Sequence, residues 1–313
     1  MNPTRLALVS LFFAGLSLIG PQASAQSDGE LLESRESLYN NIYVYRQQDG
    51  LITMLFGKNR RFWTESAYDP NDARALPVRY TRYMTVALAY PETLGSVLEI
   101  GLGGGRTAAY LNLHMPELPI TSVELDGEVI ELAEEYFDVV PSDTLRLVEK
   151  DGRLYLAANR DTHDLILVDA YRGPFVPFHL LTKEFFEIAR DRLSPGGILV
   201  QNIEPTTMLF EATVVTLKSV FDVVELFDAR GNIVAIAYDG PERKGADLAN
   251  RARALQQAHG FKYPLPTLLK DRRIVANLPE GEPLVDDFAP VEMLKAIERH
   301  NAGIDGLVED PTQ

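Results

Sequence analysis

A glycine-rich segment and the acidic residue that follows it one strand later could bind a nucleoside. Val97–Arg106 reads VLEIGLGGGR, a short apolar run that breaks into Gly101, Gly103 and Gly105. Glycines let the backbone approach a ligand where a Cβ atom would collide, and a helix opening after them points free N–H groups toward that ligand. Glu124, which ends the next apolar run, is placed to accept hydrogen bonds from two ribose hydroxyls. The glycine spacing is tighter than the dinucleotide pattern, which favours an adenosyl ligand over NAD.

Polar residues that end the other apolar runs could complete this site. Asp151 and Gly152 could hold an adenine edge, with the carboxylate on the amino group and the N–H on a ring nitrogen, although a plain Asp-Gly turn explains them equally well. Asp169 should face the reaction space, although it could instead cap a helix. Asn202 ends the next apolar run and should lie at the same edge of the sheet. His179 could serve as a general base beside Asp169, or could simply be packed. Asp169 and His179 are therefore the candidate catalytic residues.

Composition and charge exclude several classes of protein. The chain has 313 residues, 46% of them hydrophobic, which is enough for a large core without cross-links. It contains no cysteine, which excludes disulfides, thiol nucleophiles and cysteine-based zinc sites. No pair of histidines has metal-ligand spacing, so we expect no metal. The formal net charge of −15 argues against nucleic acid as a partner and favours cationic ligands such as polyamines, although acidity can also serve solubility alone.

The first residues are typical of a secretory signal peptide. Arg5 precedes an apolar run from Leu6 to Gly20, and Pro21–Ala25 supplies small residues for a cleavage site. We therefore expect residues 1–25 to be removed after Ala25 and the mature protein to be periplasmic, with no attachment to the membrane. A misassigned start would instead leave the protein in the cytoplasm.

Residues 26–92 should form a polar lead-in followed by a small β cap. Asn41–Tyr45 and Leu51–Phe56 are alternating apolar runs around an Asp-Gly turn, which predicts a β-hairpin. Arg60–Thr64 could extend the hairpin as a third strand. Apolar residues at helical spacing then predict a helix within residues 77–90.

Residues 93–240 have the pattern of a doubly wound α/β core. The first five of seven strand-length apolar runs alternate with helical patterns and predict a parallel sheet, whereas the last two have no room for a helix between them and predict an antiparallel hairpin at the sheet edge. The runs are Val97–Ile100, Ile120–Leu125, Leu145–Val148, Leu165–Val168, Ile198–Asn202, Val223–Phe227 and Ile233–Tyr238. The fold class is thus α/β, a seven-stranded, mostly parallel Rossmann-like core. Residues 241–313 should form a helical tail that ends in a helix over residues 290–300.

The chain resembles the spermidine synthase family of polyamine aminopropyltransferases, in a divergent bacterial branch. The resemblance runs from about Ser37 to Tyr238 and is strongest at residues 101–105, 123–124, 150–153 and 168–174. It implies a β cap on a class I adenosylmethionine-dependent transferase core, a homodimer, decarboxylated adenosylmethionine as co-substrate and a small polyamine-type amine as acceptor. By the same resemblance, the roles fall on four residues: Glu124 would bind the donor ribose, Asp151 and Gly152 its adenine, and Asp169 would hold or deprotonate the attacking amine.

The chain also departs from the family pattern at two acidic positions. The family usually has an aspartate in the glycine loop that binds the aminopropyl ammonium, where this chain has Gly104 or Arg106, and a second aspartate where it has Arg172. Loss of a carboxylate beside an ammonium removes roughly 1.5–3 kcal/mol, and a nearby guanidinium adds repulsion, so transfer to a normal diamine should be weak.

Two alternatives to aminopropyl transfer follow from these departures. One alternative is a methyltransferase, because Arg106 could pair with the carboxylate of intact adenosylmethionine and a glutamate at the position of Glu99 is also common in methyltransferases. Arg106 could instead be an exposed residue in the first turn of a helix, with no role in binding. The other alternative is an exported binding protein that has kept the fold and lost catalysis. Adenosyl donors are made in the cytosol, so export favours this last alternative.

Overall fold

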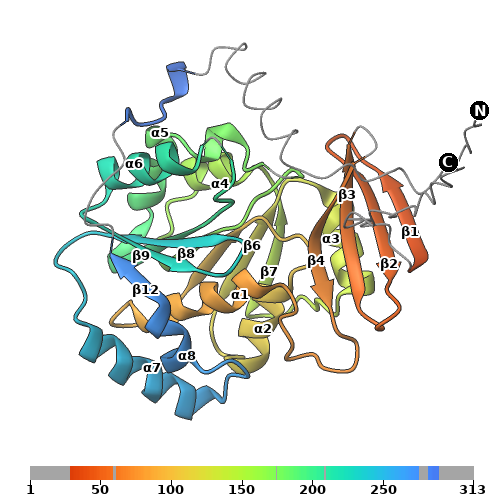
Figure 1. The fold of residues 1–313 in the computed structure, drawn as a ribbon, viewed down its shortest axis with the longest axis horizontal. Coiled ribbons are helices and arrows are strands. Elements are labelled where there is room, and N and C mark those ends of the chain that lie inside the picture. Colours follow the sequence, from red (N-terminus) through yellow and green to blue (C-terminus); the bar gives the residue numbers. More distant parts are fainter. Residues whose placement is uncertain (1–28, 59–60, 174, 208, 275–280, 289–313) are drawn as a thin grey trace, which may run out of the picture.

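Two β-sheets lie side by side in the protein, and helices pack around the larger one (Figure 1). The computed structural model describes residues 29–58, 61–173, 175–207, 209–274 and 281–288. The predicted signal peptide over residues 1–25 and the predicted helix over residues 290–300 lie outside these ranges. Within them, every helix is too short or too polar to cross a lipid bilayer.

The smaller sheet is an antiparallel meander of four strands. They are β1 (Glu30–Glu36), β2 (Asn41–Arg46), β3 (Ile52–Lys58) and β4 (Arg61–Tyr68), in that order across the sheet. The predicted hairpin is confirmed, because β2 and β3 pair around a turn in which Gly50 has a φ of +87°. The predicted third strand also forms, but it continues past Thr64 to Tyr68.

The polar lead-in is an edge strand rather than a lead-in, which corrects the prediction. β1 pairs with β2 along its length, and its Arg35 guanidinium lies within hydrogen-bond distance of Glu128, Glu131 and Glu135 on helix α3 (Gly127–Tyr136). The strand has few apolar residues because it is largely exposed, so its composition gave no strand pattern.

The larger sheet has eight strands, in the order β12-β10-β11-β9-β8-β5-β6-β7. The strands are β5 (Val97–Ile100), β6 (Ile120–Glu124), β7 (Leu145–Glu149), β8 (His163–Val168), β9 (Leu193–Ile203), β10 (Val223–Asp228), β11 (Ile233–Tyr238) and β12 (Arg272–Ile274). The five predicted parallel strands pair in parallel, and β10 and β11 form the predicted antiparallel hairpin.

The eighth strand is a correction to the seven-stranded prediction. β12 pairs antiparallel with β10 and takes the edge that the hairpin was expected to occupy. A strand of three residues is too short to show a periodic pattern, so the sequence offered no signal for it.

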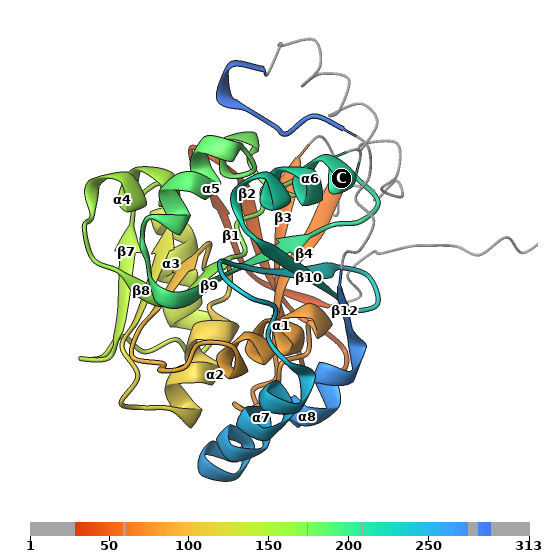
Figure 2. The ribbon, with the colours of Figure 1, turned by 90° about the vertical axis from the view of Figure 1, so that its left-hand side faces the viewer.

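Helices cover both faces of the larger sheet and create two apolar cores (Figures 1 and 2). One core packs under α4 (Gly152–Ala158), α5 (Lys183–Arg190) and α6 (Phe210–Val220). The other lies under α1 (Arg79–Met84), the 3-10 turn Thr85–Ala89, α2 (Arg106–His114), α3, α7 (Gly245–His259) and α8 (Leu265–Leu268), and it also includes residues of the smaller sheet. The predicted helix within residues 77–90 is therefore confirmed as α1 and its 3-10 extension.

The strand order creates a switch point between β5 and β8. The chain leaves β5 toward β6 on one side and later returns to β8 on the other, and in such sheets ligands bind outside the carboxyl ends of the strands at this crevice. The loops after the two strands touch, because the Asp169 N–H donates to the Ile100 carbonyl at 2.8 Å and a Cβ atom at Gly101 would collide with the Asp169 carbonyl. Gly101, with a φ of +90°, is required for this close approach.

Candidate active site

A cavity of about 690 Å³ opens at the carboxyl ends of the parallel strands, between the two sheets. It is lined by the glycine loop, strand β4, the start of α1 and the loop after β8. The predicted site residues that line it are Gly101, Gly103, Glu124, Asp151, Gly152, Asp169 and His179. Gly105 instead turns the chain into α2 with a φ of +61° and packs against Val139. Among the described residues, no group of three or more His, Asp or Glu side chains could hold a metal ion.

Glu124 ends β6 with its carboxylate held by backbone donors. Oε2 accepts from the Leu102 N–H at 2.8 Å, and Oε1 accepts from Leu125 at 2.8 Å and Asp126 at 3.1 Å. Burial raises the pKa of Glu124, although these hydrogen bonds act in the opposite direction. The Gly103 N–H also acts on the carboxylate, so four backbone donors meet about four acceptor sites, and a ligand hydroxyl would share these oxygens with the backbone. The glycine loop and Glu124 thus form one rigid wall of the cavity.

Asp151 caps a helix and binds the candidate general base. Its Oδ1 accepts from the Leu154 N–H at 2.8 Å at the start of α4, and its Oδ2 lies 2.9 Å from His179 Nε2. His179 lines the same cavity as Asp169, but its described hydrogen-bond partner is Asp151, and its role as a general base stays a prediction. Gly152 opens α4 against Ile100, where a Cβ atom would collide with the isoleucine side chain. The Asp-Gly pair therefore fixes a helix start at the wall of the cavity.

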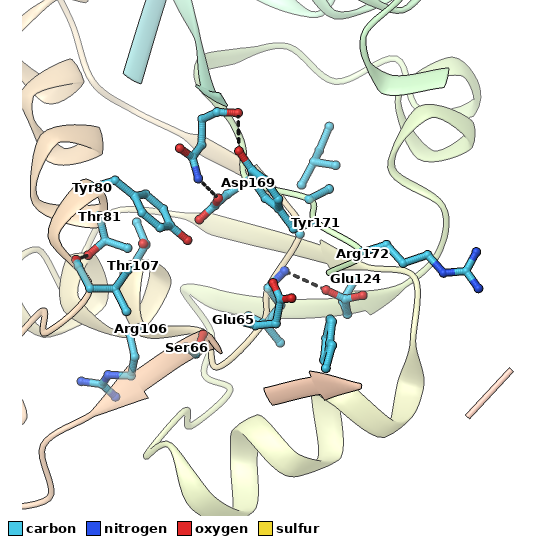
Figure 3. A pocket seen from close by; sticks show the side chains of 18 of the residues that line it. Glu65, Ser66, Tyr80, Thr81, Arg106, Thr107, Glu124, Asp169, Tyr171 and Arg172 are labelled. Carbon is cyan, nitrogen blue, oxygen red and sulfur yellow. Dashed lines mark hydrogen bonds between the residues drawn. The ribbon is translucent and has the colours of Figure 1, made fainter. Parts of the chain in front are cut away.

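Asp169 ends β8 with a partly buried carboxylate that faces the cavity (Figure 3). Oδ1 accepts from Asn202 Nδ2 at 2.8 Å, and the Tyr80 hydroxyl also donates to the carboxylate. Burial raises the pKa of Asp169 to about 6, while these two hydrogen bonds lower it. The Tyr171 hydroxyl donates to the backbone carbonyl of Asn202 at 3.2 Å and so helps to fix the backbone at this residue. A carboxylate with this pKa can accept a proton near neutral pH.

Glu65 is a cavity residue that sequence reasoning missed. It lies on β4, and its carboxylate accepts from the Gly173 N–H, while its Oε1 is buried without a hydrogen-bond partner. Burial raises the pKa of Glu65 well above its usual value, and the negative charges of Asp169 and Glu124 raise it further. The predicted strand ended one residue before Glu65. The available signal was an acidic residue directly after the predicted strand Arg60–Thr64.

Two arginines of the cavity lining donate to backbone carbonyls. Arg106 is 6% exposed, and its guanidinium donates to the carbonyls of Phe137 at 2.5 Å and Ala73 at 2.7 Å and lies 4.4 Å from the Tyr68 ring centre. It is therefore not an exposed residue, and its two terminal nitrogens are held by backbone carbonyls, while its buried Nε has no hydrogen-bond partner. Arg172 is exposed; its Nε donates to the Tyr39 carbonyl at 3.2 Å and its guanidinium points away from the acidic side chains (Figure 3). Arg172 still lines the cavity, so the repulsion of an amine by its charge stays a prediction.

Glu99, the other residue that favoured a methyltransferase, is buried in strand β5. It is 2% exposed and its Oε2 accepts from Ser122 Oγ at 2.5 Å. Burial raises the pKa of Glu99 to about 8. Glu99 does not line the cavity, so its contacts are internal to the sheet.

Comparisons with known proteins decide the family. The family model described as "Spermine/spermidine synthase domain" matches residues 79–229 of this chain. The polyamine aminopropyltransferase of Vibrio vulnificus is 32% identical over 302 residues, which cover 92% of this chain and 98% of that protein. The chain belongs to the spermine/spermidine synthase family. The matched domain contains every site residue predicted from the sequence, whereas Glu65 lies before it.

Solved structures confirm the fold of this family member. A probable spermidine synthase from Corynebacterium glutamicum aligns with a TM-score of 0.61 at 20% identity, covering 82% of this chain and 99% of that one. Human methyltransferase-like protein 13 in complex with SAH aligns with a TM-score of 0.53 at 23% identity, covering 69% of this chain and 99% of that one. Both show the Rossmann-like core of the methyltransferase type, as predicted.

Proposed function

We propose that this protein is a polyamine aminopropyltransferase, which transfers the aminopropyl group of decarboxylated adenosylmethionine to a small amine of the polyamine type. The observation that carries the proposal is the carboxylate of Asp169, which is held by Asn202 and Tyr80 in the cavity that Glu124 also lines. Membership of the family and the relative from Vibrio vulnificus support the same reaction.

The reaction needs a neutral amine close to the donor carbon. The lone pair of the acceptor nitrogen attacks the carbon beside the sulfonium, the C–S bond breaks, and its electron pair stays on sulfur to give methylthioadenosine. The nitrogen gains the aminopropyl group, and its proton passes to Asp169, whose pKa of about 6 makes it a base at neutral pH. Holding the two substrates in line supplies most of the acceleration.

The adenosyl part of the donor is assigned to the opposite wall of the cavity. Glu124 would accept the ribose hydroxyls, because backbone donors fix its carboxylate beside the glycine loop. Gly152 would offer its N–H to the adenine ring. Asp151 would take the adenine amino group while it holds His179, which we place as a positioning residue for Asp151.

A methyltransferase has less support, because both terminal nitrogens of Arg106, the residue expected to pair with the donor carboxylate, are held by backbone carbonyls. The carboxylate of intact adenosylmethionine would also meet the negative charges of Glu65 and Asp169. We expect calorimetric titration to give tighter binding of decarboxylated adenosylmethionine than of adenosylmethionine, with Glu124→Ala abolishing both. The reverse order would favour methyl transfer. Binding of polyamines without any adenosyl compound would favour the exported binding protein.

We further propose that residues 1–25 export the protein and that it forms a homodimer. Fusion of residues 1–25 to a reporter that is active only in the periplasm should give activity, whereas a silent fusion would support a cytoplasmic protein. Light scattering of the purified protein should give twice the mass of one chain, and the mass of a single chain would contradict the dimer.

A further inference from the structure

Three of the acidic side chains that line the cavity, Glu65, Glu124 and Asp169, differ in how well their oxygens are satisfied. Both oxygens of Glu124 accept backbone hydrogen bonds, and Asp169 accepts from Asn202 and Tyr80. Glu65 accepts from the Gly173 N–H, but its Oε1 is buried with no partner. A buried acceptor without a donor is costly, and the cost is removed when a ligand supplies the donor.

Four arginines line the cavity: Arg79, Arg106, Arg172 and Arg230. Three of them have partners other than Glu65, because Arg79 hydrogen-bonds Tyr83, Arg106 binds backbone carbonyls, and Arg172 donates to the Tyr39 carbonyl at the surface. None of the four arginines is among the groups that act on the pKa of Glu65, whereas the two neighbouring acids Asp169 and Glu124 are.

Glu65 lies between the two loops that meet at the switch point, namely the glycine loop after β5 and the loop after β8. Its neighbour Ser66 accepts from the Gly104 N–H at 2.7 Å, so β4 lies directly against the glycine loop. On its other side, Glu65 accepts from the Gly173 N–H of the loop that follows Asp169. Figure 3 shows Glu65, Glu124 and Asp169 around the same space. A chain that runs from a ribose at Glu124 toward Asp169 therefore passes Glu65.

We infer that Glu65 binds the primary ammonium of the donor's aminopropyl group and thereby selects decarboxylated adenosylmethionine. The inference rests on the proposed function. The ammonium would donate to the unpaired Oε1, and Glu65 would supply from strand β4 the negative charge that Gly104 does not supply from the glycine loop. An intact donor would bring its own carboxylate against Glu65 and would be rejected by like-charge repulsion.

The test is a comparison of two ligands in Glu65→Gln, which has the same shape and keeps an acceptor for the Gly173 N–H. Decarboxylated adenosylmethionine carries the ammonium, whereas methylthioadenosine lacks it but has the same adenosyl part. We expect the Kd of the decarboxylated donor to rise about 10- to 100-fold, because a charge-assisted hydrogen bond is lost. The Kd of methylthioadenosine should not change. Glu117→Gln removes the same charge from an exposed turn outside the cavity and should leave both values unchanged.

The outcomes separate this inference from the proposed function. Equal weakening of both ligands, or no weakening of either, would overturn the role of Glu65 and leave the proposed function intact. Failure of the unsubstituted protein to bind the decarboxylated donor would instead count against the proposed function. If Glu65→Gln does not fold, Glu65→Asp serves as the second variant, because its shorter side chain should also weaken the decarboxylated donor selectively. Thermal unfolding without ligand should show no loss of stability in Glu65→Gln, since Oε1 has no partner to lose.

Discussion

Two clusters in this protein combine an acidic side chain with tyrosine hydroxyls, and they differ in whether an arginine binds the acid. At the edge of the larger sheet, Glu225 is completely buried and accepts from the hydroxyls of Tyr90 and Tyr238, both at 2.5 Å. Arg272 completes this group with two further hydrogen bonds, at 2.5 and 2.6 Å. In the cavity, Asp169 accepts from Tyr80 and Asn202, but no arginine is among its described partners.

The difference separates a structural group from a binding group. Glu225 has a cation from its own chain, so its charge is neutralised in the folded state and the group holds β12 on β10. Burial raises the pKa values of Asp169 and Glu65, and the negative charges of Asp169 and Glu124 raise that of Glu65 further, while no cation is among the groups that act on either. A cationic substrate would compensate them, and this is the physical reason for placing the polyamine chemistry here.

The largest expected effect is on turnover, in Asp169→Asn. The amide cannot accept the proton of the attacking amine, so kcat should fall by about 10²- to 10⁴-fold. Release of methylthioadenosine followed by chromatography measures the rate, and calorimetry should show donor binding within a few-fold of the original. Activity close to that of the unsubstituted protein would exclude Asp169 as the base.

Arg272→Met should destabilise the fold without acting on the cavity. Removal of the cation leaves the buried Glu225 carboxylate with the two tyrosine hydroxyls but no counter-charge, which costs about 3–5 kcal/mol of unfolding free energy. Urea denaturation measures the loss, and the activity of the folded fraction should be unchanged. The double variant Arg272→Met with Glu225→Gln should recover much of the stability. If the single variant is as stable as the original, the contrast between the two groups is wrong.

Substitutions at two glycines distinguish the cost of backbone strain alone from the added cost of a collision at the switch point. Gly101 and Gly50 have φ values of +90° and +87°, so alanine is strained at both, but only Gly101 packs against the Asp169 carbonyl while Gly50 has open space. We expect Gly50→Ala to cost about 1 kcal/mol and Gly101→Ala about 2–3 kcal/mol. Thermal unfolding measures both. Only Gly101→Ala should also lower activity, and equal behaviour of the two variants would argue against the close approach.

The smallest expected effect is on the acid side of the pH profile. Asp169 must be ionised to take a proton, so log kcat/KM should rise by about one unit per pH unit below its pKa of about 6 and level off above it. Asn202→Ala removes a hydrogen bond that lowers this pKa, so the inflection should move to higher pH. A profile without an inflection near pH 6, or one that Asn202→Ala does not move, would assign the base elsewhere.

The sequence predicted most of the fold because its strands are apolar runs with a clear period. The five parallel strands and both hairpins appear where the pattern placed them. β1 and β12 were missed for physical reasons: β1 is an exposed, polar edge strand, and β12 has three residues. Such strands are defined by their pairing partners, which the local sequence does not contain.

The candidate site was predicted in part, for the residues at the ends of strands. Glu124 and Asp169 were found because the carboxyl ends of parallel strands meet at one edge. Glu65 and Tyr80 come from the cap and from α1, and only packing of the two sheets brings them to the same cavity. The directions in which the side chains of Arg106 and Arg172 point also depend on backbone carbonyls that lie far from them in the sequence. Residue type and spacing alone therefore did not predict the charge balance of the site.

The measurement that tests the account most directly is product analysis after incubation with decarboxylated adenosylmethionine and putrescine. Mass spectrometry should find methylthioadenosine and spermidine in equal amounts, with neither formed by Asp169→Asn at a comparable rate. Absence of both products, or formation of S-adenosylhomocysteine when adenosylmethionine is supplied instead, would contradict aminopropyl transfer.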